Sequence, residues 1–279
     1  MKMHTLFPAL LLLASPVFAQ QDRDPAPAEA PSIQEALETA LPPIWKKAVE
    51  ALKQPWDSNL SFNVELEEAT VQGTGTASFF SSRMFAFDLN IAGTAAGQDL
   101  SAHIQAVGDD DFLTILMEAS ELPAPQAFKI DLDVLEEMQQ QGGFDEAIAM
   151  NGMGIEELEM FLGSIDFKET KVDDGATTRI SSDLTSLLDM AAASGEDVPE
   201  SLSFVMDFNS KTSFPRQVSV DLGGVGKVGF SFSNVSFPEE FDESKYVFEA
   251  PQGVFPMDVT MMIRAGMQES GSPGYEEEF

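Results

Sequence analysis

The chain has 279 residues, no cysteine and a formal net charge of −32, from 47 acidic and 15 basic residues. A surface this acidic repels nucleic acid and anionic lipid headgroups, which argues against both as direct docking partners. Without cysteine there are no disulfides, but a chain of this length buries a sizeable core without them.

Residues 1–19 have the three parts of a secretory signal. Lys2 is the positive start, Leu6 to Ala14 the apolar stretch, and Val17-Phe18-Ala19 the small-x-small exit. The apolar stretch is too short to span a bilayer. We therefore expect a monomeric mature protein without a stable membrane anchor, exported across the inner membrane to a bacterial periplasm.

Residues 20–31 are rich in proline and alanine and are predicted to be a flexible leader. A single domain is expected over residues 32–265, followed by a disordered acidic tail at 266–279. The domain begins with helical spacing that Pro42-Pro43 interrupts. The apolar residues on the predicted helical face are Ile33, Ala36, Leu37, Ala40 and Leu41, then Ile44, Trp45, Ala48, Val49 and Leu52.

Strands with a period of two follow the helical region. Residues 60–66, 85–91 and 102–106 alternate apolar with small or polar side chains, which predicts three strands with one apolar face each. Gly73-Thr74-Gly75 is interpreted as a turn or bulge. Residues 112–117 are apolar on both faces, as in a strand that is covered on both sides.

The middle of the chain is predicted to be helical. Asp131 has the position of an N-cap for a helix that ends at Gly142-Gly143. A second helix is expected at 158–162, and a third after Ser182 or Asp183. Between the last two, Asp173-Asp174-Gly175 is expected to join two short strands as a hairpin turn.

Alternation returns in the last third of the chain. Residues 202–208, 218–222 and 228–232 are predicted strands, and Gly223-Gly224-Val225-Gly226 is the expected hairpin connection between the last two. Together the patterns predict an α+β fold. Its expected architecture is a single, strongly curved antiparallel sheet, an incomplete barrel, wrapped around a few amphipathic helices.

The aromatic composition favours an apolar ligand. The chain has 22 Phe and 14 Met against 2 Trp and 2 Tyr, and Phe and Met offer only apolar, adaptable surface. The alternative is that these side chains only fill a core, which is the usual role of an inward phenylalanine. The predicted lining residues of a cavity are Phe62, Val64, Phe85, Phe87, Leu89, Ile104, Phe204, Met206, Phe208, Phe230 and Phe232.

The order of elements resembles the lipoprotein-carrier superfamily of the bacterial periplasm. The local matches are the closing motif at 248–254 (Phe-Glu-Ala-Pro-Gln-Gly-Val), followed by Asp258-Val259, and the turn and strand at 108–113. The resemblance implies an apolar cavity that receives acyl chains. In that family an internal arginine closes the cavity. Arg83 lies near the expected place, without the proline that follows in lipoprotein carriers.

Arg83 is therefore the charged residue that we expect either to contact a headgroup or to close the mouth of the cavity. Arg179 is a second candidate for the same roles. Arg179 also has a simpler interpretation, which is pairing with nearby acidic residues on its hairpin.

The sequence argues against an enzyme and predicts no cofactor and no metal. Once the signal is removed, His103 is the only histidine, and it alternates onto the polar face of its strand. With no cysteine, the familiar nucleophile–base pairs are nearly excluded. Asp109-Asp110-Asp111 and Asp173-Asp174-Gly175 lack the spaced oxygen ligands of a calcium loop and are interpreted as turns.

Two functions remain. The first is an exported carrier or chaperone that binds a lipid or lipidated polypeptide in an apolar cavity, without covalent chemistry. The alternative is an envelope sensor or scaffold module of the same fold, with a collapsed cavity, that binds a protein partner through its acidic surface. The acidic residues are spread along the whole chain, which favours a role in solubility over a dedicated basic partner.

Overall fold

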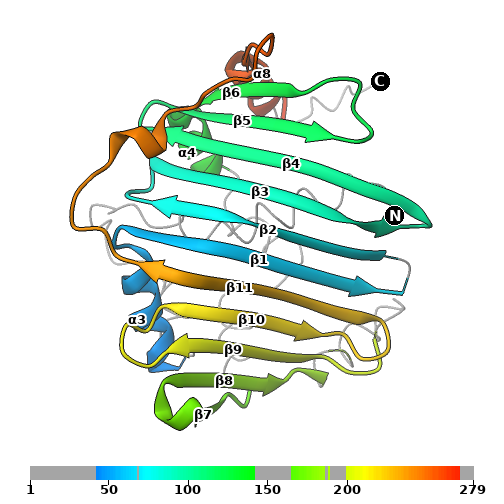
Figure 1. Cartoon of the computed structure of the whole chain (residues 1–279), viewed down its shortest axis with the longest axis vertical. Helices are drawn as coiled ribbons and strands as arrows, with labels where there is room; N and C mark the ends of the chain where they lie inside the picture. Colours follow the sequence, from blue (N-terminus) through cyan, green and yellow to red (C-terminus); the bar gives the residue numbers. More distant parts are fainter. Residues whose placement is uncertain (1–41, 68, 142–164, 186–187, 189–198, 271–279) are drawn as a thin grey trace, which may run out of the picture.

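The computed structural model describes residues 42–67, 69–141, 165–185, 188 and 199–270. Twelve strands form one sheet in the spatial order β12-β6-β5-β4-β3-β2-β1-β11-β10-β9-β8-β7 (Figure 1). The strands are β1 Trp56–Leu66, β2 Ala69–Phe79, β3 Met84–Ala95, β4 Gln98–Asp109, β5 Phe112–Ala119, β6 Gln126–Asp131, β7 Lys168–Val172, β8 Thr177–Asp183, β9 Ser203–Asn209, β10 Pro215–Asp221, β11 Gly226–Ser236 and β12 Met257–Asp258. The helices are α3 Pro43–Leu52, α4 Leu132–Gln141 and α8 Thr260–Ser270, with short 3₁₀ turns η2 Asp173–Gly175 and η3 Glu243–Tyr246.

The prediction of one large antiparallel sheet is confirmed, and the sheet is not closed. Its edges are β12 and β7, and every neighbouring pair is antiparallel except β12 with β6. Helices are few among the described residues, so the described part is mostly β. The helices that the sequence predicts at 32–41, at 158–162 and over most of the segment after Asp183 lie outside the described residues.

The sheet consists of two meanders joined at its centre. β1 to β6 run outward in chain order on one side, and β7 to β11 run inward on the other. β1 pairs with β11 in antiparallel register, with Phe62 opposite Phe230 and Val64 opposite Val228. The register carries the apolar positions of both meanders onto the same face of the sheet, because side chains alternate with a period of two.

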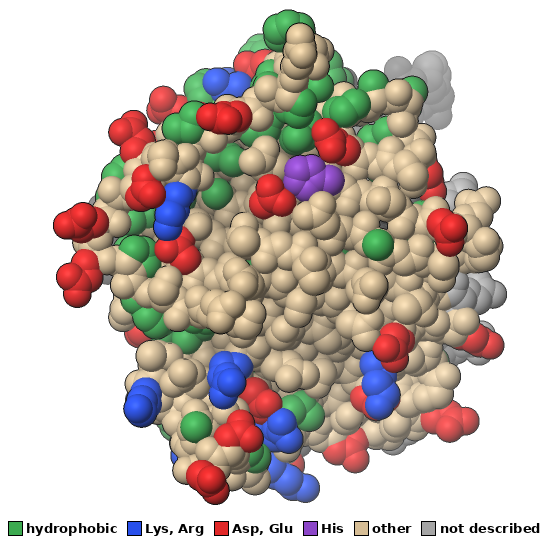
Figure 2. Space-filling model, viewed as in Figure 1, with side chains coloured by type: hydrophobic (Ala, Val, Ile, Leu, Met, Phe, Trp, Pro, Cys, Tyr) green, Lys and Arg blue, Asp and Glu red, His purple; other side chains and the backbone are tan. Residues whose placement is uncertain are grey.

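The opposite face is polar. Its positions on β1 and β11 include Asn59, Ser61, Asn63 and Ser231, and the hydroxyl oxygens of Ser61 and Ser231 lie 2.7 Å apart. Figure 2 shows this face, with few charged or hydrophobic side chains over the central strands and most charged side chains around its margin. Such a face remains hydrated, so the core lies on the other side.

One local prediction was wrong. Gly73, Thr74 and Gly75 form no turn or bulge but lie in the middle of β2, in unbroken register with both neighbouring strands. A Cβ at Gly73 would collide with the ring of Phe62, which is directly opposite on β1. The glycine therefore makes room for a large side chain on the next strand.

Helix α3 covers part of the apolar face, behind the sheet in Figure 1. Pro43 occupies the first turn, where its missing N–H costs nothing. Ala51 belongs to a buried cluster with Trp56, and Ala48 to a second cluster with Phe208. The sequence predicted Ala48 on the apolar face of this helix, but not Ala51.

Several predicted caps and turns are confirmed. The Asp131 carboxylate accepts a hydrogen bond from the Asp133 N–H at 2.8 Å at the start of α4. The turn at 173–175 joins β7 to β8, and residues 222–225 join β10 to β11. β5 is covered on both faces, since Leu113 and Leu116 are both buried.

A strap of residues 237–256 leads from β11, at the centre of the sheet, to β12 at its edge. It carries η3, whose Tyr246 is buried and stacks on Phe241. Phe241 in turn contacts Phe80, and Lys245 Nζ lies 2.7 Å from Asp57 Oδ2. After the strap, α8 runs to Ser270 and so passes the boundary at 265 that the sequence suggested.

Gly73→Ala tests the space made for Phe62. We expect the free energy of unfolding to fall by about 1–3 kcal/mol, because the added methyl group forces the ring from its place. In the Phe62→Leu background the same substitution should cost clearly less. Denaturant melts of the two single variants and the double variant measure this coupling. Simple additivity would contradict the packing described here.

Because the Tyr246 side chain is buried, we expect the fold to lose stability at alkaline pH. Burial, with smaller contributions from Asp57 and Asp242, raises its pKa from 10.0 to about 12. The raised pKa stabilises the fold below pH 10, and the stabilisation is lost as pH rises toward 12. The expected loss is roughly 2 kcal/mol, from 1.36 kcal/mol per unit. The Tyr246→Phe variant should not show this loss of stability when its free energy of unfolding is measured between pH 10 and pH 12. If the variant has the same pH profile as the wild type, the prediction is wrong.

Candidate ligand-binding site

The eleven apolar residues singled out from the sequence all lie on one face of the sheet. In one row Phe62 is opposite Phe230, which is flanked by Val218 and then by Met206. On the other side of β1, Leu89 of β3 is opposite Ile104 of β4. We call the surface made by these eleven residues the apolar face: Phe62, Val64, Phe85, Phe87, Leu89, Ile104, Phe204, Met206, Phe208, Phe230 and Phe232.

Burial on this side of the sheet differs between the two ends of the strands. Trp56, Phe79 and Phe85, at one end of three adjacent strands, are 2%, 3% and 2% exposed. Several members of the apolar face are only partly buried, including Phe62, Val64, Phe204, Met206, Phe230 and Phe232. This end of the sheet is therefore closed core, whereas the partly buried members of the apolar face retain surface that a ligand can cover.

Two tryptophans mark two aromatic clusters on this side of the sheet. Trp56 packs edge-to-face on Phe214 at 5.3 Å and on Phe232 at 5.9 Å. Trp45 of α3 stacks on Phe204 at 6.1 Å and meets Phe208 edge-on at 5.9 Å. Each indole therefore reports on a different part of the apolar face.

The two indole N–H groups differ. Trp56 Nε1 donates to the Leu52 carbonyl at 3.2 Å. Trp45 Nε1 is buried, and no acceptor for it exists among the described residues. A buried donor without an acceptor costs free energy, so this N–H favours an oxygen from outside the described part of the chain.

Arg83 connects the sheet to α4. Its Nη2 lies 2.8 Å from Asp133 Oδ1 and its Nη1 lies 3.3 Å from Glu136 Oε1. Its Nε donates to the Asp110 carbonyl at 2.7 Å. The hydrogen bond to Asp133 is the main reason why the pKa of Arg83 is raised. The guanidinium is engaged on all three nitrogens and holds the β2–β3 turn against α4, while its predicted roles at the mouth of a cavity stay predictions.

The remaining polar candidates have structural roles. Arg179 forms a two-pronged pair with Asp207 across β8 and β9, at 2.7 and 2.8 Å, so its acidic partner lies on β9 and not, as the simpler interpretation predicted, on its own β7–β8 hairpin. His103 lies on the polar face, with Nε2 3.1 Å from Asp88 Oδ1 and Nδ1 3.5 Å from Glu118 Oε2. His103 therefore points away from the apolar face, which is formed by the side chains on the other side of the same strands.

The two acidic stretches form turns. Asp109 Oδ1 accepts hydrogen bonds from the N–H groups of Asp111 and Phe112, and Asp173 Oδ2 accepts from the Thr177 hydroxyl. In the described part of the chain no group of three or more histidine and carboxylate side chains is arranged to hold a metal ion. None of the described helices is both long and apolar enough to cross a bilayer.

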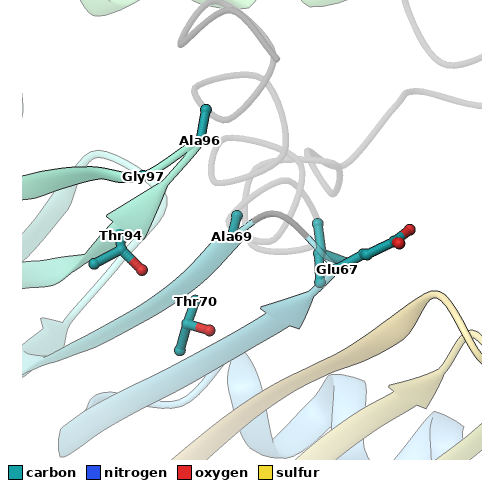
Figure 3. A pocket seen from close by; sticks show the side chains of 7 residues that line it. Glu67, Ala69, Thr70, Thr94, Ala96 and Gly97 are labelled. Atoms are coloured by element: carbon teal, nitrogen blue, oxygen red, sulfur yellow. The ribbon is translucent and has the colours of Figure 1, made fainter.

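Two surface cavities were not foreseen from the sequence. The first, of about 530 Å³, lies at the tips of the β1–β2 and β3–β4 connections (Figure 3). It is shallow, and its lining is mostly small: Leu66, Glu67, Ala69, Thr70, Thr94, Ala96 and Gly97. Among the described residues that line it, only Glu67 is charged. The second, of about 590 Å³, lies beside Phe214 and Phe232 at the opposite ends of the strands.

Sequence reasoning missed Phe79 and Phe214 as members of the core beside the apolar face. Phe79 continues the alternation of Val71 and Ala77 along β2, so it could have been found if the glycines had been assigned to the strand. Phe214 lies in the short connection before β10, where no periodic pattern exists.

Comparisons with known proteins give only remote similarities. No protein-family model and no curated protein matches the chain. Among solved structures, lipoprotein LppX of Mycobacterium tuberculosis is 14% identical over 71% of this chain and 96% of its own, with a TM-score of 0.36. LprF of Mycobacterium bovis is 11% identical over 77% and 98%, with a TM-score of 0.34. A β-barrel-like protein with domain of unknown function DUF1849, from Brucella abortus, is 6% identical over 67% and 99%, with a TM-score of 0.28.

Arg83→Gln tests the role of this arginine. Loss of the pairs to Asp133 and Glu136 should lower the free energy of unfolding by about 1 kcal/mol. Hydrogen exchange should increase in α4 more than elsewhere. The control is Lys53→Gln, which breaks only an exposed pair with Glu50 at the C-terminal end of α3 and should have a smaller effect. Unchanged exchange in α4 would contradict the closing role.

Proposed function

We propose that this chain is an exported carrier or chaperone that binds the acyl chain of a lipid or lipidated polypeptide on its apolar face. The observation that carries the proposal is the register of β1 with β11. It brings eleven apolar side chains from five strands onto one surface, of which part stays incompletely buried. Binding then needs only the removal of hydrocarbon from water, without covalent chemistry.

The energetics favour long chains. Each buried methylene contributes about 0.8 kcal/mol, so about sixteen methylenes contribute roughly 13 kcal/mol. Association costs at least about 4 kcal/mol in lost freedom of motion. The difference corresponds to an affinity on the order of micromolar. Short chains would bind far more weakly.

Trp45 supports an acyl ligand over a plain hydrocarbon. Its N–H is buried beside Phe204 and Phe208 without an acceptor among the described residues. An ester or carboxyl oxygen can accept from it, whereas an alkane cannot.

The competing function is a sensor or scaffold that binds a protein partner while its apolar face serves only as core. The central part of the polar face carries mainly uncharged side chains, with acidic groups around its margin (Figure 2). Such a module would bind no fatty acid and would carry no lipid after purification.

Dibromostearate separates the two functions, because bromine quenches nearby indoles. We expect quenching of Trp45 in the Trp56→Phe variant and of Trp56 in the Trp45→Phe variant, with half-saturation in the micromolar range. Organic extraction and mass spectrometry of the purified protein should also show bound lipid. Absence of both quenching and lipid would contradict the carrier and leave the scaffold.

Two variants that add one carboxylate, each on a different face of the sheet, provide a matched control for ligand binding. Phe62→Asp puts a carboxylate on the apolar face and should abolish quenching, because an acyl chain cannot solvate it. Thr74→Asp puts the same charge on the polar face of β2, at an exposed position, and should leave quenching unchanged. Circular dichroism checks that both variants fold. Phe62→Leu keeps the surface apolar and should retain binding.

A further inference from the structure

The second cavity lies where three chain segments meet. Its walls come from the β9–β10 hairpin, the β7–β8 turn and the end of β11. The Ser210 N–H donates to the Ala176 carbonyl at 3.0 Å and ties the first two segments together. Phe214, Phe232 and Phe237 supply the aromatic part of the lining. The cavity is thus built on paired backbone and not on one loose loop.

The charged lining is basic. Lys211 and Arg216 both line the cavity, and none of its described lining residues is Asp or Glu. In a chain with 47 acidic and only 15 basic residues, an acid-free cavity with two cations departs from the rest of the surface. Beside a phenylalanine surface, such cations favour a ligand that is both anionic and apolar.

These two cations are available. In the described part of the chain, neither Lys211 nor Arg216 has a carboxylate in ion-pair contact, whereas Arg83, Arg179 and Lys245 each have one. Arg216 Nη1 donates to the Thr177 hydroxyl at 2.7 Å, which uses one of its five donors. Both side chains belong to exposed residues.

Phe232 connects this cavity to the apolar face. It lines the cavity, yet its ring centroid lies 5.0 Å from that of Phe230 on the apolar face. Phe214 lies 5.4 Å from Phe232 and fills the space toward Trp56. Phe214 is itself only 1% exposed, so the aromatic surface that leads from the two cations toward the proposed acyl chain is that of Phe232, which is partly buried.

We propose that this cavity binds the anionic headgroup, a carboxylate or phosphate, of the amphiphile whose chain covers the apolar face. Lys211 and Arg216 donate to the headgroup oxygens, and Phe232 and Phe237 contact the first methylenes. The inference rests on the proposed function for the position of the chain. It adds the class of ligand, an anionic single-headed amphiphile, and the two residues that recognise its charge.

Competition against a neutral fluorescent alkyl probe tests the proposal with three ligands of one chain length: oleate, oleyl phosphate and oleyl alcohol. We expect both anions to bind about tenfold tighter than the alcohol, the effect of one charge-assisted contact. Lys211→Gln with Arg216→Gln should reduce this preference to about onefold and leave the affinity for the alcohol unchanged. High salt should reduce the preference in the wild type.

Lys47→Gln is the matched control. Lys47 is exposed on α3, has no ion-pair partner in the described part of the chain and lies outside the cavity lining. It should keep the full preference. An equal loss in this variant would mean that net charge, not the cavity, sets the preference, and would overturn the proposal.

Acetate and inorganic phosphate separate a headgroup from a free anion. Neither should compete with the probe or protect the protein against thermal unfolding at concentrations where oleate and oleyl phosphate saturate. Protection by inorganic phosphate alone would make the cavity a site for small anions and overturn the proposal. If the alcohol binds as tightly as the anions, the headgroup site is wrong but the carrier stands. If none of the three binds, both are wrong.

Discussion

The structure depends on the pairing of β1 with β11. These strands come from opposite halves of the chain, and their register aligns Phe62 with Phe230 and Val64 with Val228. A slip of one residue would turn the apolar positions of one meander toward solvent. The single apolar face, the cover given by α3 and the proposed ligand site all exist because this register holds.

Space on the apolar face is set by small residues as much as by large ones. Gly73 leaves room for the Phe62 ring, and Gly75 lies between Leu60 and Leu89 in the next row. A sheet with large side chains on every strand would fill its own concavity. The glycines of β2 lie between the large side chains of β1 and β3. The rings of these strands are therefore next to positions that have no side chain.

Three of the basic side chains discussed above form ion pairs that join separate elements of the fold. Arg83 and Lys245 use their charge to fasten α4 and the strap to the sheet, and Arg179 neutralises a nearly buried Asp207. An ion pair that joins separate elements orders them, even where its net contribution is small. Lys211 and Arg216 are not used in this way, which is what distinguishes the cavity between them from the rest of an acidic surface.

The alternation of Phe85, Phe87 and Leu89, or of Phe204, Met206 and Phe208, determined by itself which side of each strand is apolar, because strand geometry allows no other arrangement. The sequence could not show which strands are neighbours, since pairing of β1 with β11 joins residues 160 to 179 positions apart. It misassigned Gly73 because a glycine in a strand and a glycine in a turn look alike until the opposing ring is known. It also missed Lys211 and Arg216, because only the folded β9–β10 hairpin places them beside Phe232. Local periodicity decided the faces, and long-range contacts decided the site.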